Sequence, residues 1–376
     1  MIRLRKGVVT RIVRERPTFQ ELRVLVEGAE RPAAAYPALS GPVAPGDVVT
    51  LNTTATALGL GSGGYDFVVA VDGERSADPP APGHIMKLRY TPLQVKVLSV
   101  EEEESPHHAA LDQCESLEGL PVVVGSLHSQ LVPAVLGVRR FAGAGCRVVY
   151  LMTDGGALPL AWSETVDRLR REGLLAATIT VGQAFGGDFE AINKFSGLLA
   201  AKVAAGADVA VVTMGPGIVG TGTRWGHTGL EAGEWVNAVA ALGGSPIAVP
   251  RLSFGDARER HRGVSHHFLT ALGRVARAPA VVPVPVMGGG RDEEVWDTLT
   301  EAFAAPGCPP HELRRVDASF LAEALAATGW EPTSMGRGFA ADPAPFLGAA
   351  AAGRVAAEAW LAGRGQAGGA SRSSNC

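Results

Sequence analysis

The sequence predicts an α/β protein in which a doubly wound, mostly parallel sheet of the Rossmann-like kind follows a small all-β barrel domain. Short β-branched runs separated by glycine and proline fill residues 1–100, with no helical periodicity between them. From Pro121 onward, apolar strand-like runs alternate with amphipathic segments, which is typical of parallel strands covered by helices on both faces. The chain has 376 residues, which is long for a single hydrophobic core. Two folded domains are therefore expected.

Composition divides the chain into four parts. A β-barrel domain is expected over residues 1–100, because five or six short strands usually close on themselves to hide their edges. The acidic run EEEESP opens a linker over residues 101–120. The α/β domain is expected over residues 121–362, which is too short for the eight strand-helix units of a TIM barrel. Residues 363–376 are rich in glycine and serine and are expected to be disordered.

Each expected strand is a short β-branched run, and each expected helix repeats apolar residues every three or four positions. In the barrel domain, strands are expected at residues 7–13, 22–26, 47–52, 66–71 and 94–100. In the α/β domain, they are expected at residues 122–124, 147–152, 176–181, 208–214, 246–249, 280–287 and 313–316. Helices are expected at residues 131–142, 163–172, 190–205, 230–242, 266–275, 291–304, 319–328 and 345–361. The last helix is apolar enough to cover either the core or a second copy of the chain, which leaves a homo-oligomer open.

Composition and charge exclude several classes of protein. Hydrophobic residues make up 46% and charged residues 19% of the chain, which is typical of a globular protein. The net charge of −4 gives no support for a nucleic-acid partner. No signal-peptide core is present at the N-terminus, and no apolar run reaches the roughly 20 residues that a membrane span needs. No membrane partner is therefore expected. The four cysteines show no CxxC spacing and no disulfide framework, so a cytoplasmic protein is expected.

The strongest functional signal is the stretch of residues 208–235, where an apolar run ends at a glycine-rich segment and a helix pattern follows. Glycines expose backbone N–H groups, and N–H groups beside a helix N-terminus attract anions. Other polar residues follow the neighbouring expected strands, whose carboxyl ends meet at one edge of the sheet. The residues expected to bind a small anionic ligand are Ser126, Gly215, Gly217, Gly220, Thr221, Thr223, Arg224 and Asp256.

The segment GPGIVG matches the dinucleotide-binding pattern by its letters, but its context differs. Residues 221–229 contain three more glycines and are not readily helical, whereas in the dinucleotide-binding fold the helix begins within the motif. The acid at the next strand end, Asp256, lies well beyond the usual spacing of about 20 residues. No Gly-Lys-Ser or Gly-Lys-Thr follows, which excludes a Walker A loop. A dedicated phosphate or carboxylate cradle is expected instead.

Histidines gather at the same predicted edge. Imidazole titrates near neutral pH, so His128 and His227, together with Asp154, are the expected catalytic acid-base residues. A divalent metal is the other use of such a cluster, with His261 and His266 as its expected ligands, although HExxH spacing is missing. His266 and the adjacent His267 project about 100 degrees apart on a helix, so at most one of them is expected to face the cleft.

Three segments, HIMKLRYTPLQ (84–94), MGPGIVGTGT (214–223) and HRGVSHH (261–267), resemble a conserved-hypothetical family of bacterial cytoplasmic proteins described only as a domain of unknown function. The resemblance extends to about Trp360 and implies no activity, cofactor or catalytic residue. The residues themselves indicate a cytoplasmic enzyme that binds an anionic small molecule, for example a phosphorylated one, at the strand ends. Its chemistry is expected to be acid-base or metal-assisted. The alternative is a non-catalytic metabolite sensor or a protein-interaction module.

Overall fold

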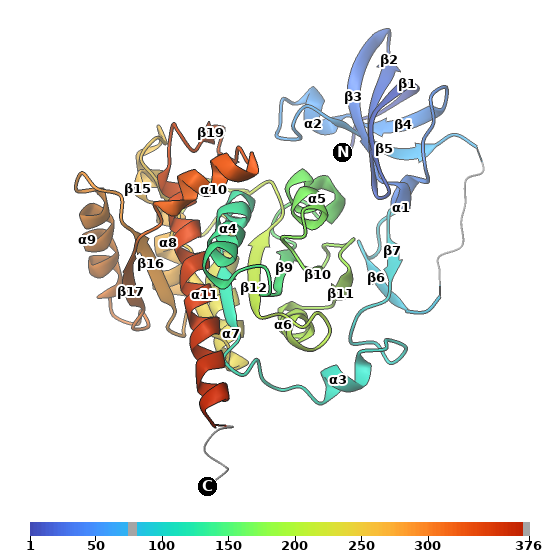
Figure 1. The fold of residues 1–376 in the computed structure, drawn as a ribbon. Helices are drawn as coiled ribbons and strands as arrows, with labels where there is room; N and C mark the ends of the chain where they lie inside the picture. The colour runs from blue at the N-terminus through green and yellow to red at the C-terminus, as the bar shows by residue number, and fades with distance from the viewer. Residues whose placement is uncertain (74–80, 371–376) are drawn as a thin grey trace. The chain divides into compact units, whose positions relative to one another are not determined.

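The computed structural model describes residues 1–73 and 81–370, with side chains described up to residue 364 (Figure 1). Internal contacts divide the chain into two units, Met1–Leu98 and Ser99–Cys376. Part of the tail expected to be disordered, residues 371–376, lies outside the described residues. Within the described part of the chain, no helix combines the length and the apolar character needed to cross a bilayer.

The first unit is a closed barrel of five strands in the order β1-β2-β3-β5-β4, which confirms the predicted all-β domain. Antiparallel pairing of β1 with β4 closes it, and β3 pairs with β5 in parallel. Buried valine and leucine side chains fill its interior. The barrel strands are β1 (Leu4–Arg16), β2 (Phe19–Val26), β3 (Ala29–Ala35), β4 (Val48–Asn52) and β5 (Asp66–Val71). Two short helices, α1 (Pro37–Ser40) and α2 (Thr54–Ala57), and a hairpin of β6 (Ile85–Lys87) and β7 (Val95–Val97) complete this unit.

Strand β3 is the barrel strand that the sequence did not predict. Its sequence, AERPAAA, contains no β-branched or aromatic residue. The turn between β2 and β3 has the backbone conformation of a hairpin, because Glu27 and Gly28 both have positive φ angles, 49° and 82°. Two such residues form a tight hairpin turn that aligns Val26 with Ala29. Pairing with β2 therefore overrides the weak strand propensity.

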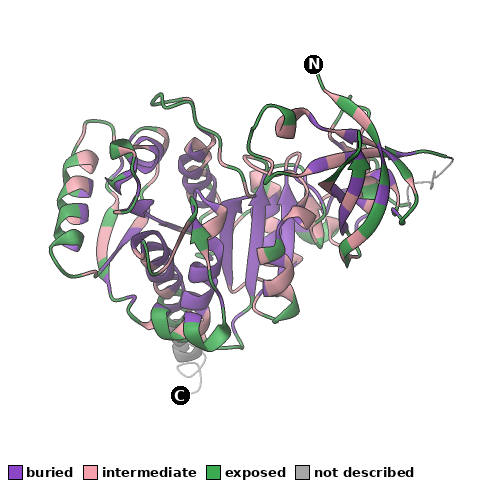
Figure 2. Ribbon diagram, turned by 90° about the horizontal axis from the view of Figure 1, so that it is seen from above, coloured by how far each residue is buried: buried purple, intermediate pink, exposed green. Residues whose placement is uncertain are grey.

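The second unit contains an eight-stranded sheet in which all pairs are parallel, so the predicted doubly wound α/β domain is confirmed. The strand order is β11-β10-β9-β12-β8-β13-β16-β17. Figure 2 shows that its central strands are buried. The strands are β8 (Pro121–Val124), β9 (Val148–Thr153), β10 (Ala177–Val181), β11 (Phe189–Ala191), β12 (Val209–Met214), β13 (Ser245–Ala248), β16 (Val281–Pro285) and β17 (Glu312–Val316).

Helices cover both faces of this sheet because successive strand residues point to opposite sides. Val122 and Val124 belong to one buried cluster and Val123 to the other. Side chains from α4 (Leu131–Ala142), α5 (Glu164–Arg171), α10 (Phe320–Thr328) and α11 (Ala344–Ala370) pack with Val123, and Figure 1 shows α4 beside α11. The opposite cluster contains side chains from α3 (His108–Asp112), α6 (Lys194–Val203), α7 (Glu231–Ala241), α8 (His266–Thr270) and α9 (Arg291–Phe303). A π-helical turn, Ala271–Val275, extends α8.

The strand order reverses at the centre of the sheet. After β8 the chain builds β9, β10 and β11 on one side, then returns to insert β12 between β9 and β8. It continues on the other side of β8 with β13, β16 and β17. In open α/β sheets, ligands bind beyond the carboxyl ends of the strands where the order reverses. The loops after β8, β12 and β13 are therefore the expected place for a ligand.

Two small hairpins lie beyond these strand ends. One consists of β14 (Leu252–Ser253) and β15 (Gly263–Val264) and follows β13. The other consists of β18 (Thr333–Ser334) and β19 (Arg337–Gly338) and precedes α11. Both supply side chains to the cavities described next.

Candidate functional site

A small cavity of about 120 Å³ lies between the glycine-rich loop after β12 and the segment after β13. We call it the arginine cavity. Ile218, Val219, Gly220, Gly222 and Met335 form part of its wall. The rest is cationic or imidazole: Arg251, Arg258, Arg260, His261 and His267. These ten lining residues include no acidic side chain.

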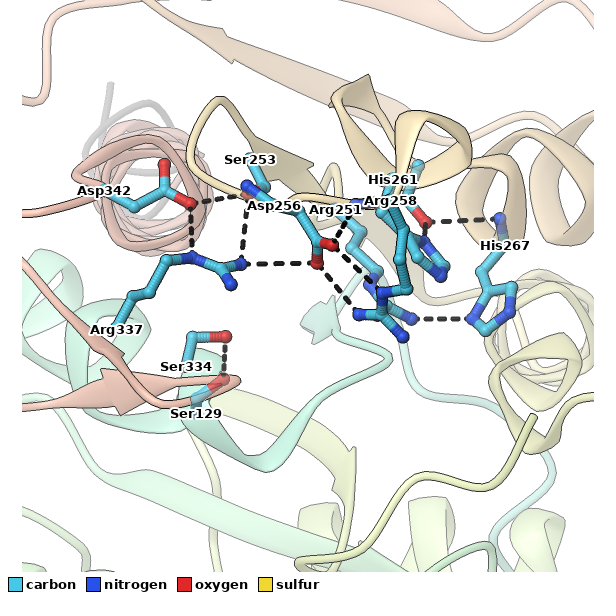
Figure 3. Close-up of polar contacts among 11 residues, drawn as sticks. Ser129, Arg251, Ser253, Asp256, Arg258, His261, His267, Ser334, Arg337 and Asp342 are labelled. Atoms are coloured by element: carbon cyan, nitrogen blue, oxygen red, sulfur yellow. Dashed lines mark hydrogen bonds and ion pairs between the residues drawn. The ribbon is translucent and has the colours of Figure 1, made fainter. Parts of the chain in front are cut away.

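Arg251 is the most unusual of the lining residues, because its side chain is buried and only 5% of the residue is exposed. Its Nη1 donates a hydrogen bond of 2.6 Å to Nδ1 of His267 (Figure 3). Among the described residues, no carboxylate lies within ion-pairing distance of its guanidinium. Burial, with a contribution from Arg258, lowers its pKa to about 10, so it stays charged at neutral pH. It is thus a buried cation that forms no ion pair among the described residues, and the opposing charge of Asp256 acts on it from beyond ion-pairing distance.

The charge of Arg258, which also lines the arginine cavity, is neutralised by Asp256. Asp256 accepts two hydrogen bonds from the Arg258 side chain, and a third guanidinium, that of Arg337, lies 3.3 Å from the same carboxylate (Figure 3). The hydrogen bonds from Arg258 are the main reason that the pKa of Asp256 lies far below its usual range. Arg337 also pairs with Asp342, whose carboxylate accepts a hydrogen bond from the hydroxyl of Ser253. This network attaches the β18–β19 hairpin to the segment after β13.

Four imidazoles, those of His227, His261, His266 and His267, form one histidine cluster beside the arginine cavity. The rings of His227 and His267 are stacked, with centroids 3.7 Å apart. Those of His266 and His267 lie 4.4 Å apart, and those of His261 and His267 lie 4.8 Å apart. Both ring nitrogens of His227 and Nε2 of His266 are buried without a hydrogen-bond partner in the described part of the chain. Burial is the largest cause that lowers the pKa of all four rings.

The hydrogen bond from Arg251 fixes the proton on one of these rings, that of His267. A guanidinium can only donate, so Nδ1 of His267 accepts from Arg251 and the ring proton sits on Nε2. Nδ1 of His261 lies 2.7 Å from the hydroxyl of Ser265, the residue that caps helix α8. Burial, and then the charge of Arg251, lowers the pKa of His261 to about 4 and that of His267 to about 2. Both rings are therefore neutral at pH 7.

Three of the histidines also have the arrangement of metal ligands. One ring nitrogen from each of His261, His266 and His267 lies within 4.8 Å of the others. Both adjacent histidines thus join the cluster, but only His267 lines the arginine cavity.

A second cavity, of about 530 Å³, lies over the carboxyl ends of β8 and β12, and we call it the switch-point cavity. It shares Ile218 and Met335 with the arginine cavity. His128 lines it, with Nε2 2.7 Å from the hydroxyl of Ser163 and Nδ1 3.3 Å from the carbonyl oxygen of Met214. Both nitrogens of this ring are thus already engaged, which holds the ring in place.

The glycine loop divides between these cavities. Gly215 and Gly217 line the switch-point cavity, and Gly220 lines the arginine cavity. A β-carbon on Gly220 would lie 3.3 Å from Cε1 of His267, so glycine allows the loop to approach that ring closely. The hydroxyls of Thr221 and Thr223 lie 3.0 Å apart and close the loop by bonding to the backbone of Gly226.

Other residues singled out from the sequence lie elsewhere. Arg224 is exposed and lines neither cavity. The N–H of Ser126 donates to Oε1 of Gln130, so it is not available to an anion. Asp154 accepts a hydrogen bond of 3.0 Å from the backbone N–H of Gln183, at the end of β10.

Beside Asp154 lies a carboxyl group that sequence reasoning missed. Glu231, at the start of α7, accepts a hydrogen bond of 2.6 Å from the hydroxyl of Thr153. Burial is the main reason that its pKa is raised to about 7, and the charge of Asp154 adds to the effect. An acidic residue in the first turn of a helix is so common that position alone gave no signal.

Sequence reasoning also missed the residues that give the arginine cavity its charge, Arg251, Arg258 and Arg260. All three lie in the segment that follows the strand expected at residues 246–249, and this run of arginines after a strand was the available signal. Met335 and Ser334 had no such signal, because the hairpin that carries them is more than 100 residues away from the glycine loop in sequence.

The sequence matches the model of a known protein family. Residues 32–353 match the model of a family described as "Protein of unknown function (DUF3866)". The match covers most of the chain, so the protein belongs to this family. No curated protein matches the sequence.

Proposed function

We propose that this member of the DUF3866 family is an enzyme that binds a phosphate-bearing small molecule, with the phosphate group in the arginine cavity. The observation that carries the proposal is the buried guanidinium of Arg251, which lines the cavity and forms no ion pair with a carboxylate of the described residues. A buried charge is costly unless it is paired. A phosphate oxygen would provide that partner through a charge-assisted hydrogen bond.

The remaining lining favours an anion over a cation. Arg260 is exposed and, within the described residues, forms no ion pair, so it adds a second uncompensated positive charge. Gly220 and Gly222 bring the backbone, without side chains, to the same cavity. Because no acidic residue lines the cavity, a negatively charged group would meet attraction from several sides.

The two histidines that line the cavity are suited to different roles. His267 carries its proton on Nε2, so it would donate a hydrogen bond to negative charge on the ligand. In the tautomer in which Nδ1–H of His261 donates to the hydroxyl of Ser265, Nε2 would accept a proton as the general base. In this proposal His227 supports the cluster by stacking on His267. We assign no proton transfer to His128 or Asp154.

Binding of inorganic phosphate, followed by calorimetry, tests the anion site. The wild-type protein is expected to bind phosphate, and Arg260→Gln is expected to weaken binding by roughly tenfold or more, since a hydrogen bond to a charged group contributes about 1.5–3 kcal/mol. Arg262→Gln is the matched control, because Arg262 is exposed nearby and lines neither cavity. A wild-type protein that does not bind phosphate contradicts the proposal.

Turnover of phosphate esters separates the enzyme from the sensor. If His261 is the general base, His261→Gln loses turnover while it still binds phosphate. A sensor would bind phosphate and turn over no ester, in the wild type as well as in the variant.

A metal-assisted enzyme is the second candidate, and the spacing of His261, His266 and His267 favours it. Three imidazoles are a common ligand set for Zn²⁺. Two features weigh against it: His267 holds its proton on Nε2 while Arg251 occupies Nδ1, and the nearby guanidiniums repel a cation. Metal analysis of purified wild-type protein and of His266→Ala decides, because a stoichiometric metal that the variant loses would establish the metal site.

We also propose a cytoplasmic location and no nucleic-acid partner. Cys114, Cys146 and Cys308 are free thiols, which fits a reducing compartment. The net charge of −4 gives no basis for binding a polyanion over the whole surface.

A further inference from the structure

The arginine cavity and the switch-point cavity are neighbours, because Ile218 and Met335 line both. The arginine cavity, about 120 Å³, has the scale of one small ionic group, whereas the switch-point cavity, about 530 Å³, falls in the usual range of small-molecule sites. A ligand that placed a charged group in the first would extend naturally into the second. The residues that line the two cavities therefore indicate which kind of ligand would fit both.

The described residues that line the switch-point cavity include no lysine or arginine. Its walls are largely apolar, with Leu127, Val132, Met214 and Trp330 among them. Hydroxyl groups come from Ser129 and Ser334, which hydrogen-bond to each other at 3.0 Å across the cavity wall. The one charged lining residue is Glu331, which is exposed and acidic. A second phosphate group would find no cation here, whereas an uncharged organic group would find apolar contacts and a few hydroxyl partners.

The position of this cavity supports its use as a binding site. It lies where the strand order reverses, between the loops that follow β8 and β12. The β18–β19 hairpin closes another side, and the Arg337 network holds that hairpin against the arginine cavity. One hairpin thus contributes to both cavities, and Figure 3 shows Ser334 and Ser129 beside the arginine network.

We propose that the ligand is a monophosphate ester with an uncharged, largely apolar organic group, which occupies the switch-point cavity while its phosphate occupies the arginine cavity. This inference rests on the proposed function and adds the substrate class to it. Polyphosphates and pyrophosphate-linked dinucleotides are excluded from that class, because the second phosphate would lie beside apolar side chains and Glu331.

The experiment compares the binding of inorganic phosphate, pyrophosphate, phenyl phosphate and 1-naphthyl phosphate by calorimetry on the full chain. For the wild type, we expect 1-naphthyl phosphate to bind roughly tenfold or more tightly than inorganic phosphate, because its rings leave water for apolar walls. Phenyl phosphate should be intermediate, and pyrophosphate should gain nothing over phosphate.

Cavity-filling variants locate the organic group. Thr165, on α5, and Thr333, on β18, line the switch-point cavity but not the arginine cavity. Thr165→Trp is expected to remove the advantage of the naphthyl ester without weakening phosphate binding, and Thr333→Trp keeps the test possible if the first variant does not fold. Thr300→Trp is the matched control, because Thr300 is an exposed helical threonine outside both cavities.

The outcomes separate the two proposals. Loss of the naphthyl advantage in the cavity-filling variants supports the substrate class. Phosphate binding with no naphthyl advantage, or with an advantage that both tryptophan variants keep, overturns this inference and leaves the proposed function standing. If the wild type binds neither phosphate nor ester, the proposed function fails and the substrate class fails with it.

Discussion

Burial shifts the pKa of several side chains in this protein, and His128 is the clearest example outside the histidine cluster. Its ring is tied between Ser163 and the carbonyl group of Met214. Burial lowers its pKa to about 4, although the carbonyl hydrogen bond opposes the shift. The folded protein therefore keeps this ring neutral at pH values where an unfolded chain protonates it.

This difference in protonation makes the free energy of unfolding depend on pH. Between pH 6.5 and about 4, the unfolded chain binds a proton on His128 that the folded protein does not bind. The free energy of unfolding therefore decreases as pH falls through this range, by up to about 1.4 kcal/mol per pH unit for one group. Above pH 6.5 the contribution is constant.

We predict that, between pH 6 and 4.5, the free energy of unfolding of His128→Gln falls less steeply with decreasing pH than that of the wild type. The difference between the two slopes should correspond to the uptake of up to one proton on unfolding. Urea unfolding of the wild type and the variant at several pH values measures this difference. The other buried histidines titrate in both proteins, so they cancel in the comparison. Equal slopes for the two proteins would show that His128 does not resist protonation in the folded state.

Among the elements, helices α4 and α11 pack most closely. Gly137 of α4 faces the carbonyl group of Ala350, and Gly353 of α11 faces that of Ala134. A β-carbon on Gly353 would overlap the carbonyl oxygen of Ala134. These glycines allow the two backbones to touch, and α11 also contacts β8, β13 and β16 across that face of the sheet.

We predict that Gly353→Ala lowers the free energy of unfolding by about 1–3 kcal/mol or more, because an extra carbon in a filled interface forces the helices apart. Gly363→Ala is the control in the same helix. Nothing lies within 4 Å of a β-carbon there, so the higher helix propensity of alanine should raise stability by about 1 kcal/mol. Denaturant unfolding of both variants checks the prediction, and a Gly353→Ala protein as stable as the wild type would argue against close contact of the two backbones.

For the whole molecule, the main feature is that the described residues that line both cavities belong to the second unit. The first unit has its own buried cluster, built from the barrel strands.

We predict that a fragment of residues 99–376 binds inorganic phosphate with the affinity of the full chain. Calorimetry on the fragment, after circular dichroism has shown that it is folded, makes the comparison. A folded fragment with much weaker binding would mean that the barrel contributes to the site.

The sequence by itself determined the class of the fold and most of its elements. Helix 131–142 was predicted with the bounds that α4 has, and the strands at 122–124 and 208–214 agree with β8 and β12 to within a residue. Periodicity is a local property, so buried strands and amphipathic helices can be read from neighbouring residues. Parallel pairing followed from the alternation of strands and helices, and it placed the glycine loop and the histidines at one edge of the sheet.

The tertiary structure alone decided which of those residues meet. His227 and His267 are 40 positions apart in sequence but stacked in space, and Met335 reaches the glycine loop from a hairpin near the C-terminus. It also decided the charge of the site, since Arg258 is paired with Asp256 while Arg251 forms no ion pair in the part of the chain that the structure describes. The physical reason is that burial and pairing depend on the side chains that surround a residue in three dimensions. The sequence indicates which element a residue belongs to. It does not indicate which side chains will surround the residue and so determine its ionisation state, its tautomer and its burial.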